Sequence, residues 1–421
     1  MSAETLAAGQ SPSDFSYVDP DVNSNPWAFF ESVQRECPVY QIPETGTFIV
    51  TKYEDLRHVL RNHEIFSSTV TASATGGDQD IGQKIIREGG GWAPVSTLQR
   101  TDPPVHGRYR KLLDRVFTIK RVREMTPYID QVSNDLIDSW IDAGECEFNN
   151  DFAMPMPGII IAEQLGLGRD EVARFKRWAD AMLGVGSSGM PTEDDIRANA
   201  ETELEAQLYL AEVFEDRRQN PKDDLMSALV HAHGDDEEPL TMQELQSLMH
   251  QLITGGFETT QSAIDHGMWT LVRFPELVTR LRENDALIKP FIEEVLRWES
   301  PVQFLARRTT QDVELSGTLI PENSMVMVGY APANRDADKF ACPHQFDMER
   351  KNVGAHLAFG SGAHFCVGAL LARQEMISAF RLLVSRLDNI QLSRPLPTPV
   401  HHFSMFFQPM HDFHIAFDRA S

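Results

Sequence analysis

Cysteine is scarce in this sequence, and the few cysteines are not paired. Cys37, Cys146, Cys342 and Cys366 are widely separated, and no two of them form a Cys-x-x-Cys motif. Disulfide-rich scaffolds depend on closely spaced sets of cysteines, so this spacing argues against such a scaffold. The pattern fits a reducing compartment, and we expect a cytoplasmic protein.

Long hydrophobic runs are missing as well. No stretch reaches roughly 18 apolar residues, the minimum for a membrane span. The polar N-terminal segment, residues 1–25, has neither a basic start nor a hydrophobic core, so it resembles neither a signal peptide nor an anchor. We therefore expect no membrane association.

Positive charge is limited. The chain has 38 lysines and arginines against 62 acidic residues, a net charge of −24. Nucleic acids and anionic membranes recruit basic surfaces, so neither is expected as a partner. The exception is the stretch 106–124, in which basic residues outnumber Asp114 and Glu124. Its basic residues are Arg108, Arg110, Lys111, Arg115, Lys120, Arg121 and Arg123. Taken alone, this stretch is equally well explained as a solvated helix face.

Strand-like segments are few. Residues 40–42 and 47–51 flank a Pro-Glu-Thr-Gly turn and predict a hairpin, and residues 313–315 and 325–328 predict a second pair. Most of the remaining chain has helical patterns. We predict a mainly α protein with small β-sheets, of the α+β class. Length alone, at 421 residues, would suggest two or three domains.

The clearest helical pattern runs from residue 241 to about residue 272. Thr241 and Glu244 form a capping box at its start, and a proline follows its end. Its middle contains Gly255 and Gly256, which each cost a helix roughly 1 kcal/mol relative to alanine. Bare backbone at this point leaves room for a small ligand. A kinked core helix is the alternative explanation.

Cys366 ends a glycine-rich run that precedes another helical stretch. The run reads Phe359-Gly-Ser-Gly-Ala-His364-Phe-Cys366-Val-Gly368, and residues 369–376 have the composition of a helix. We expect the sulfur just outside the helix N-terminus, where N–H groups and the helix dipole favour a thiolate. A thiolate held in this way is a metal ligand or a nucleophile.

The spacing Phe-x-x-Gly-x-His-x-Cys-x-Gly, followed by Leu-Ala-Arg, resembles the haem-ligand loop of the cytochrome P450 family. The segment Gly255-Gly-Phe-Glu258-Thr259 resembles the oxygen-activating stretch of the same family, and further motifs follow in the family's order over nearly the whole chain. The resemblance implies the cytochrome P450 fold, with one domain over residues 1–421. Haem would be buried between the long helix and the cysteine loop.

The resemblance also implies roles for the site residues. Cys366 would be the axial ligand to the iron of haem b, iron protoporphyrin IX, and such thiolate ligation favours O–O cleavage. Glu258 and Thr259 would be the acid and the alcohol that deliver protons to the reacting oxygen. Many members of the family carry aspartate where this chain has Glu258.

Other family positions match residues that would contact haem or support its loop. His106, Arg110, Arg307 and His364 stand at the propionate-binding positions, although Arg308 adjoins Arg307 and leaves that register open. Phe359, Gly360, Gly368 and Gly255 would border the cofactor. Glu294, Arg297 and Arg350 match a buried ion-pair network whose role is structural.

The same correspondence places the substrate pocket. Its walls would come from lid or access loops at residues 71–102 and 181–200, from the long helix, and from later segments. The named contacts are Gln251, Thr254, Gly255, Val302, Phe304, Leu305 and Phe406. They are mostly apolar, with Gln251 and Thr254 as candidate hydrogen-bonding groups, so a hydrophobic terpenoid, aromatic or steroid-like molecule is expected.

These features imply a monooxygenase that inserts one oxygen atom from O₂ into its substrate. Electrons would come from NAD(P)H through a reductase and a [2Fe-2S] ferredoxin that docks on the basic stretch 106–124, and we expect a monomer. A peroxide-driven haem-thiolate peroxygenase is the alternative within the family, although it normally lacks the acid-alcohol pair. A remote alternative is a zinc-binding structural protein that uses Cys342, His344, His364 and Cys366.

Overall fold

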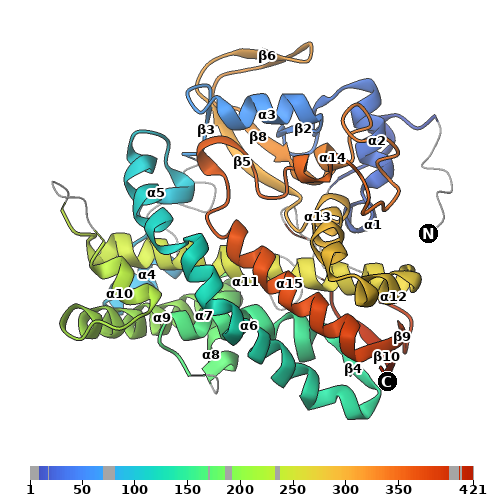
Figure 1. Cartoon of the computed structure of the whole chain (residues 1–421). Coiled ribbons are helices and arrows are strands. Elements are labelled where there is room, and N and C mark those ends of the chain that lie inside the picture. Colours follow the sequence, from blue (N-terminus) through green and yellow to red (C-terminus); the bar gives the residue numbers. More distant parts are fainter. Residues whose placement is uncertain are drawn as a thin grey trace. The chain divides into compact units, whose positions relative to one another are not determined.

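The computed structural model describes residues 9–17, 19–69, 81–168, 171–184, 192–232, 238–397, 407 and 410–420. The chain divides into two compact units. Unit 1 comprises Met1–Val70, Thr126–Ala153 and Thr259–Ser421, and unit 2 comprises Thr71–Met125 and Met154–Glu258. Helices α6 (Ile119–Trp140) and α11 (Met242–Arg273) contribute residues to both units (Figure 1). The single domain expected from the family resemblance stays a prediction.

Unit 1 contains a five-stranded mixed sheet with the order β1-β2-β8-β5-β3. Its strands are β1 (Val39–Gln41), β2 (Phe48–Val50), β3 (Phe66–Ser67), β5 (Phe304–Thr309) and β8 (Met325–Gly329). Strands β2 and β8 are parallel, and the other neighbours are antiparallel. The hairpin of β1 and β2 confirms the first pair predicted from the sequence.

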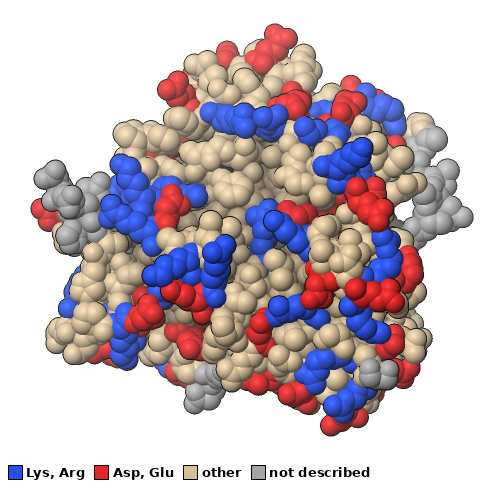
Figure 2. Space-filling model, in the orientation of Figure 1, with Lys and Arg blue, Asp and Glu red and all other residues tan. Residues whose placement is uncertain are grey.

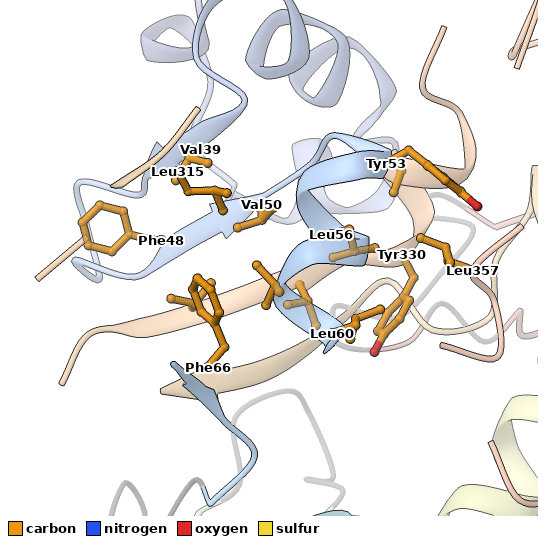
Figure 3. Close-up of a cluster of buried hydrophobic side chains, with 14 of the residues drawn as sticks. Val39, Phe48, Val50, Tyr53, Leu56, Leu60, Phe66, Leu315, Tyr330 and Leu357 are labelled. Atoms are coloured by element: carbon orange, nitrogen blue, oxygen red, sulfur yellow. The ribbon is translucent and has the colours of Figure 1, made fainter. Parts of the chain in front are cut away.

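The two faces of this sheet bury different clusters, because successive side chains of a strand point to opposite faces. Phe48 and Val50 join Leu56 and Leu60 of α3 (Tyr53–Arg61) on one face (Figure 3). Ile49 lies in the opposite cluster with phenylalanines of α2 (Trp27–Glu36). Each fully buried apolar side chain of this size contributes about 1.5–3 kcal/mol to folding.

The second predicted strand pair is wrong in its pairing. Residues 313–315 form β6 (Val313–Leu315), which pairs with β7 (Thr318–Ile320) in a separate two-stranded sheet. Strand β8 pairs instead with β2 and β5. Ser316 and Gly317 both have positive φ angles, 46° and 78°, and so close a tight two-residue hairpin before residue 325 is reached.

The remaining elements of unit 1 are helical except for one further sheet, which has the order β4-β10-β9. Its strands are β4 (Glu145–Glu147), β9 (Leu387–Leu392) and β10 (His414–Arg419). The helices are α1 (Pro20–Ser24), α12 (Glu276–Glu283), α13 (Ile288–Trp298), α14 (Tyr330–Asn334) and α15 (Ala369–Arg386). Short helical turns include η8 (Val353–Ala355) and η9 (Gly362–His364).

All regular elements among the described residues of unit 2 are helices. Besides parts of α6 and α11 it contains α4 (Ile81–Glu88), α5 (Val105–Val116), α7 (Pro155–Gln164), α8 (Val172–Leu183), α9 (Glu193–Gln219) and α10 (Leu225–Val230). The predicted capping box starts α11, because Thr241 N donates to Glu244 Oε2 over 2.8 Å and Glu244 N donates back to Thr241 Oγ1 over 3.3 Å. The predicted loop at 71–102 contains α4, which the glycine-rich composition concealed. Together with its sheets in unit 1, the chain has the predicted mainly α architecture.

Across these described residues, none of the helices combines the length and hydropathy that a bilayer crossing requires.

Candidate active site

The loop that carries Cys366 is ordered by backbone hydrogen bonds within unit 1. The Cys366 amide donates to the Phe359 carbonyl over 2.9 Å, and the Gly360 amide donates to the Leu357 carbonyl over 2.8 Å. A Cβ added to Gly368, the residue before α15, would lie 3.9 Å from the sulfur. The exposed sulfur thus lies beside the N-terminal end of α15, where the sequence predicts it.

Two glycines give this loop its shape. Gly360 and Gly362 have φ angles of +72° and +71°, a region that side chains with a Cβ rarely adopt. A Cβ on Gly362 would also stand 2.7 Å from the Leu60 carbonyl oxygen at the end of α3. The loop therefore packs directly on the backbone of α3, and a larger residue at position 362 would push it away.

Arg307 is a buried cation close to the same loop. Its side chain is in contact with the Tyr330 phenol, and its Nη1 donates to the Ala306 carbonyl over 2.8 Å. Burial raises the pKa of Tyr330, Arg307 lowers it, and the charge of Cys366 raises it further. Tyr330 interacts electrostatically with both groups, so Arg307 and Cys366 lie in one neighbourhood of unit 1.

This arginine needs an anion that the described residues do not supply. Arg307 is only 6% exposed, yet across the described ranges no carboxylate lies within ion-pair distance of it. Side chains alternate along β5, so Arg308 points to the other face of the strand. Of these two adjacent arginines, Arg307 is therefore the better candidate for the propionate-binding position. A thiol and a buried guanidinium in one neighbourhood fit a haem, whose propionates form charge-assisted hydrogen bonds with arginine.

His364 belongs to the same part of unit 1. It ends the short turn η9, and its Nε2 lies 3.0 Å from the Ser68 hydroxyl. This contact fixes the imidazole next to the residue that follows β3. The structure thus brings together His364, Phe359, Gly360, Gly368 and Cys366 in one loop.

Glu293 supports the loop from α13 and was not anticipated from the sequence. Its carboxylate accepts bonds from Arg373 Nε and Nη2 over 2.6 and 3.0 Å, and it lies 2.9 Å from His356 Nε2. Burial opposes ionisation, but the bonds from His356 and Arg373 lower the pKa of Glu293 to about 2. The Arg373 guanidinium also lies 4.2 Å from the centre of the Phe359 ring. Consecutive glutamates at 293 and 294 were the only available signal.

The predicted ion-pair network is also assembled in unit 1. Arg297 donates from Nε and Nη2 to the two oxygens of Glu294, each over 2.7 Å, and both side chains are 0% exposed. Arg350 Nε lies 3.4 Å from the same carboxylate. The Arg297 guanidinium also binds the carbonyls of Asn334 and Pro343, each over 2.9 Å. These bonds fix the chain segment that leads toward the cysteine loop.

The oxygen-activating segment lies in the middle of α11, and the division between the units passes through it. In unit 2, a Cβ on Gly255 would meet no atom of the described residues within 4 Å, whereas a Cβ on Gly256 would lie 3.2 Å from Ile161 of α7. Gly255 therefore opens space beside the helix, and Gly256 permits close packing. Thr259, the first residue of unit 1 on this helix, is half-buried.

Glu258 has an environment suited to an acid. Burial and the nearby charge of Asp180 raise the pKa of Glu258 to about 7, while Lys176 lowers it. Lys176 and Asp180 form an ion pair of 2.6 Å on α8, within unit 2. A carboxyl group with this pKa exchanges protons readily near neutral pH.

His106 and Arg110, both predicted to bind propionates, lie on α5 in unit 2. His106 is buried in the first turn, and Arg110 pairs with Asp114 over 2.8 Å. Figure 2 shows Lys and Arg side chains gathered over α5. Lys111 and Arg115 are exposed there, one turn apart.

The predicted substrate contacts divide into three groups. Val302 and Leu305 are partly buried against the sheet core, and Val302 forms a bridge with Phe407. Phe304 was assigned wrongly: it is 0% exposed, with its ring 5.6 Å from that of Tyr17, because strand alternation turns it into the sheet core. Phe406 lies outside the described residues.

The two polar groups expected to face substrate are already bonded within unit 2. Gln251 Oε1 accepts from the Gln99 amide over 2.8 Å, and its Nε2 donates to Thr97 Oγ1 over 2.6 Å. The Thr254 hydroxyl donates to the His250 carbonyl over 2.8 Å. Both side chains therefore organise the protein itself.

The zinc alternative finds no support in the part of the chain that is described. Its four ligand candidates all lie there, and no three His, Cys, Asp or Glu residues gather in it as a metal site would require.

Comparisons with known proteins identify the family of this chain. The family model for cytochrome P450 matches residues 196–413. The chain is 32% identical to cytochrome P450 monooxygenase PikC of Streptomyces venezuelae, over 90% of this chain and 88% of the relative. It is 33% identical to a methyl-branched lipid omega-hydroxylase of Mycobacterium bovis, over 90% and 87%. The solved structure of cytochrome P450 CYP109Q5 from Chondromyces apiculatus matches with a TM-score of 0.84 and 32% identity, covering 97% of this chain and 99% of that one. The chain therefore belongs to the cytochrome P450 family and is a P450 monooxygenase.

Proposed function

We propose that this monooxygenase inserts one oxygen atom from O₂ into a hydrophobic small molecule. Its electrons come from NAD(P)H through a ferredoxin reductase and a [2Fe-2S] ferredoxin. The observation that carries the proposal is the buried Arg307 near the Cys366 loop, a cation without a carboxylate partner in the described chain. An anionic, iron-containing cofactor satisfies both residues at once.

The cofactor in this proposal is haem b. When bound, a thiolate-ligated haem supplies the activation of O₂. In unit 1, Cys366 would hold the iron, and Arg307 and His364 would hold propionate. The family resemblance also assigns His106 and Arg110 to propionate binding. By the same resemblance, Phe359, Gly360, Gly368 and Gly255 would border the ring.

Proton delivery is assigned to Glu258 and Thr259. Burial and Asp180 raise the pKa of Glu258 to about 7, so the carboxyl group both holds and releases protons at neutral pH. Thr259 is its neighbour in sequence and places a hydroxyl on the same helix. This pair favours an O₂-dependent enzyme over the peroxide-driven alternative.

An apolar substrate fits the residues assigned to the pocket. Gln251 and Thr254 use their polar groups within the protein, and no described residue would touch a Cβ added to Gly255. Val302 and Leu305 supply aliphatic surface. The relative named as a methyl-branched lipid omega-hydroxylase acts on a molecule of the same apolar character.

The absorbance spectrum of the reduced, CO-bound protein tests the reaction class. A strongly red-shifted Soret band, lost in Cys366→Ser, is the expected result. Turnover with NAD(P)H, reductase and ferredoxin should exceed turnover with hydrogen peroxide alone. Equal or faster peroxide-driven turnover would identify a peroxygenase, and a colourless protein after hemin addition would overturn the proposal.

A further inference from the structure

An extended segment of unit 2 is bonded along one side of α11. This segment, residues 92–97, is called the strap here, and the helical turn η3 (Leu98–Arg100) follows it. It belongs to no helix or sheet, its last residue Thr97 has an extended backbone, and Ala93, Val95 and Thr97 are more buried than the exposed Pro94 and Ser96 between them. An unpaired extended backbone exposes polar groups that need partners.

Side chains of α11 supply these partners at a regular interval. Gln243 Nε2 donates to the Ala93 carbonyl over 2.8 Å, and the Val95 amide donates to Ser247 Oγ over 2.9 Å. One interval further on, Gln251 Nε2 donates to the Thr97 hydroxyl over 2.6 Å, and its Oε1 accepts over 2.8 Å from the amide of Gln99 in the turn that follows the strap. These three α11 side chains are called the ladder.

The spacing of the ladder explains why the two elements match. Four residues of helix advance about 6 Å, and two residues of extended chain advance about 6.6 Å. A strap that follows the ridge of every fourth helical residue therefore meets one ladder side chain at every second residue. The three α11 side chains thus supply hydrogen bonds to the strap that a neighbouring strand would supply in a sheet.

The start of the strap is bonded to α9 in the same unit. The Trp92 amide donates to Gln207 Oε1 over 2.8 Å, and Gln246 Nε2 donates to the Gln207 carbonyl over 2.8 Å. A Cβ on Gly91 would stand 2.9 Å from Leu204 Cδ1, so glycine permits this close approach. The strap is therefore tied to α9 at its start and to α11 along its length.

The ladder leads directly to the open side of α11. Gly255 follows Gln251 by four residues, a rotation of only about 40° around the helix. Among the residues that the structure describes, a Cβ added to Gly255 would meet nothing within 4 Å. The last bonded residues of the strap thus lie one turn from the space assigned to substrate.

We propose that Gln243, Ser247 and Gln251 are positioning residues that hold the strap as a fixed wall of the substrate pocket, and so set the size of molecule that enters. This inference rests on the proposed function. It reassigns Gln251 from a substrate contact to a wall support. Selectivity follows because a wall held by directed hydrogen bonds does not yield to a bulky ligand, whereas a released strap does.

Hydrogen exchange and ligand entry test this proposal in the haem-loaded protein. Ser247→Ala removes the acceptor of the Val95 amide, so exchange of that amide should accelerate about tenfold. Association of phenylimidazole, followed by the Soret shift, should become at least three times faster, while association of the smaller imidazole stays unchanged. Gln243→Glu replaces the donor to the Ala93 carbonyl by an acceptor and should act in the same direction.

The matched control is Ser139→Ala, which removes an exposed hydroxyl bonded to its own helix at the Leu136 carbonyl. It should change neither measurement. Unchanged Val95 exchange in Ser247→Ala, or equal acceleration of both imidazoles, would overturn the strap proposal. Hydrogen exchange is also measured in the protein without haem. If the protein binds no haem, the proposed function is refuted, but the exchange of the Val95 amide still tests the strap proposal.

Discussion

Glu294 and Arg297 form a two-point ion pair in which neither side chain is exposed. Removing one member of a buried pair leaves the other charge uncompensated, at a cost of about 3–5 kcal/mol. We expect Glu294→Gln to lower the free energy of unfolding by this amount in denaturant titration. Glu349→Gln is the control, because its pair with Arg280 is exposed and should change stability by less than about 1 kcal/mol. Equal losses in the two variants would contradict the role assigned to the buried pair.

Glu375 predicts an unusual dependence of stability on pH. It is 1% exposed on α15, and burial raises its pKa to about 8. The folded state therefore holds a proton that the unfolded state releases above its ordinary pKa, so this residue destabilises the fold as pH rises from about 4.5 to about 8.

Glu375→Gln removes that penalty and should stabilise the protein at pH 9 by about 2–4 kcal/mol, with no gain at pH 4. Thermal unfolding of both proteins at the two pH values measures the difference. A gain of the same size at pH 4 would show that packing, and not ionisation, is responsible.

Thr259→Ala tests proton delivery. Without the hydroxyl, electrons from NAD(P)H should be consumed without matching product, and hydrogen peroxide should accumulate. Thr270→Ala provides the control on the same helix, since its hydroxyl is bonded to the His266 carbonyl over 2.8 Å. Product and peroxide are quantified per NAD(P)H oxidised, and full coupling in Thr259→Ala would remove this residue from the relay.

Arg307→Leu should weaken haem binding, because charge-assisted hydrogen bonds to a buried carboxylate contribute about 1.5–3 kcal/mol. The expected effect is a rise of about tenfold or more in the rate of haem transfer to apomyoglobin. Arg308→Leu changes the adjacent residue, which β5 turns to its other face, and should leave the rate nearly unchanged. If the two rates are reversed, the register of this strand relative to the propionates has been assigned wrongly.

The exposed residues Lys111 and Arg115 of α5 test the ferredoxin surface. Reversing both to glutamate should slow reduction by an acidic ferredoxin at least tenfold at low salt, because complementary charge speeds encounter. The difference should shrink as salt screens the charges. Stopped-flow reduction measures both effects, and an unchanged rate would place the docking surface elsewhere.

Local patterns were sufficient to predict several parts of this molecule. The capping box of Thr241 and Glu244, the first hairpin and the placement of Cys366 beside a helix all depend on residues close in sequence. The partner of β8 was missed because strand pairing across distant segments leaves no local signal. Phe304 was misassigned for a related reason, since a strand's inward and outward faces become clear only once its neighbours are known.

Two other supporting contacts of the site were not predicted from the sequence. Glu293 binds Arg373 across 80 positions, and Gln251 binds Thr97 across 154. Glutamates and glutamines are common on helix surfaces, so the sequence did not predict Arg373 as the partner of Glu293, and it predicted substrate rather than Thr97 as the partner of Gln251. Only the folded chain shows that both the oxygen and the nitrogen of the Gln251 side-chain amide are hydrogen-bonded within the protein.

The sharing of α6 and α11 between the two units limits how this enzyme can be recombined with its relatives. Each unit is assembled from separated stretches, and a junction at residue 125 or 258 cuts through a continuous helix. A chimaera that exchanges only one stretch of unit 2 would pair its strap with a foreign α11. Grafting of substrate preference should therefore succeed only when residues 71–125 and 154–258 are transplanted together.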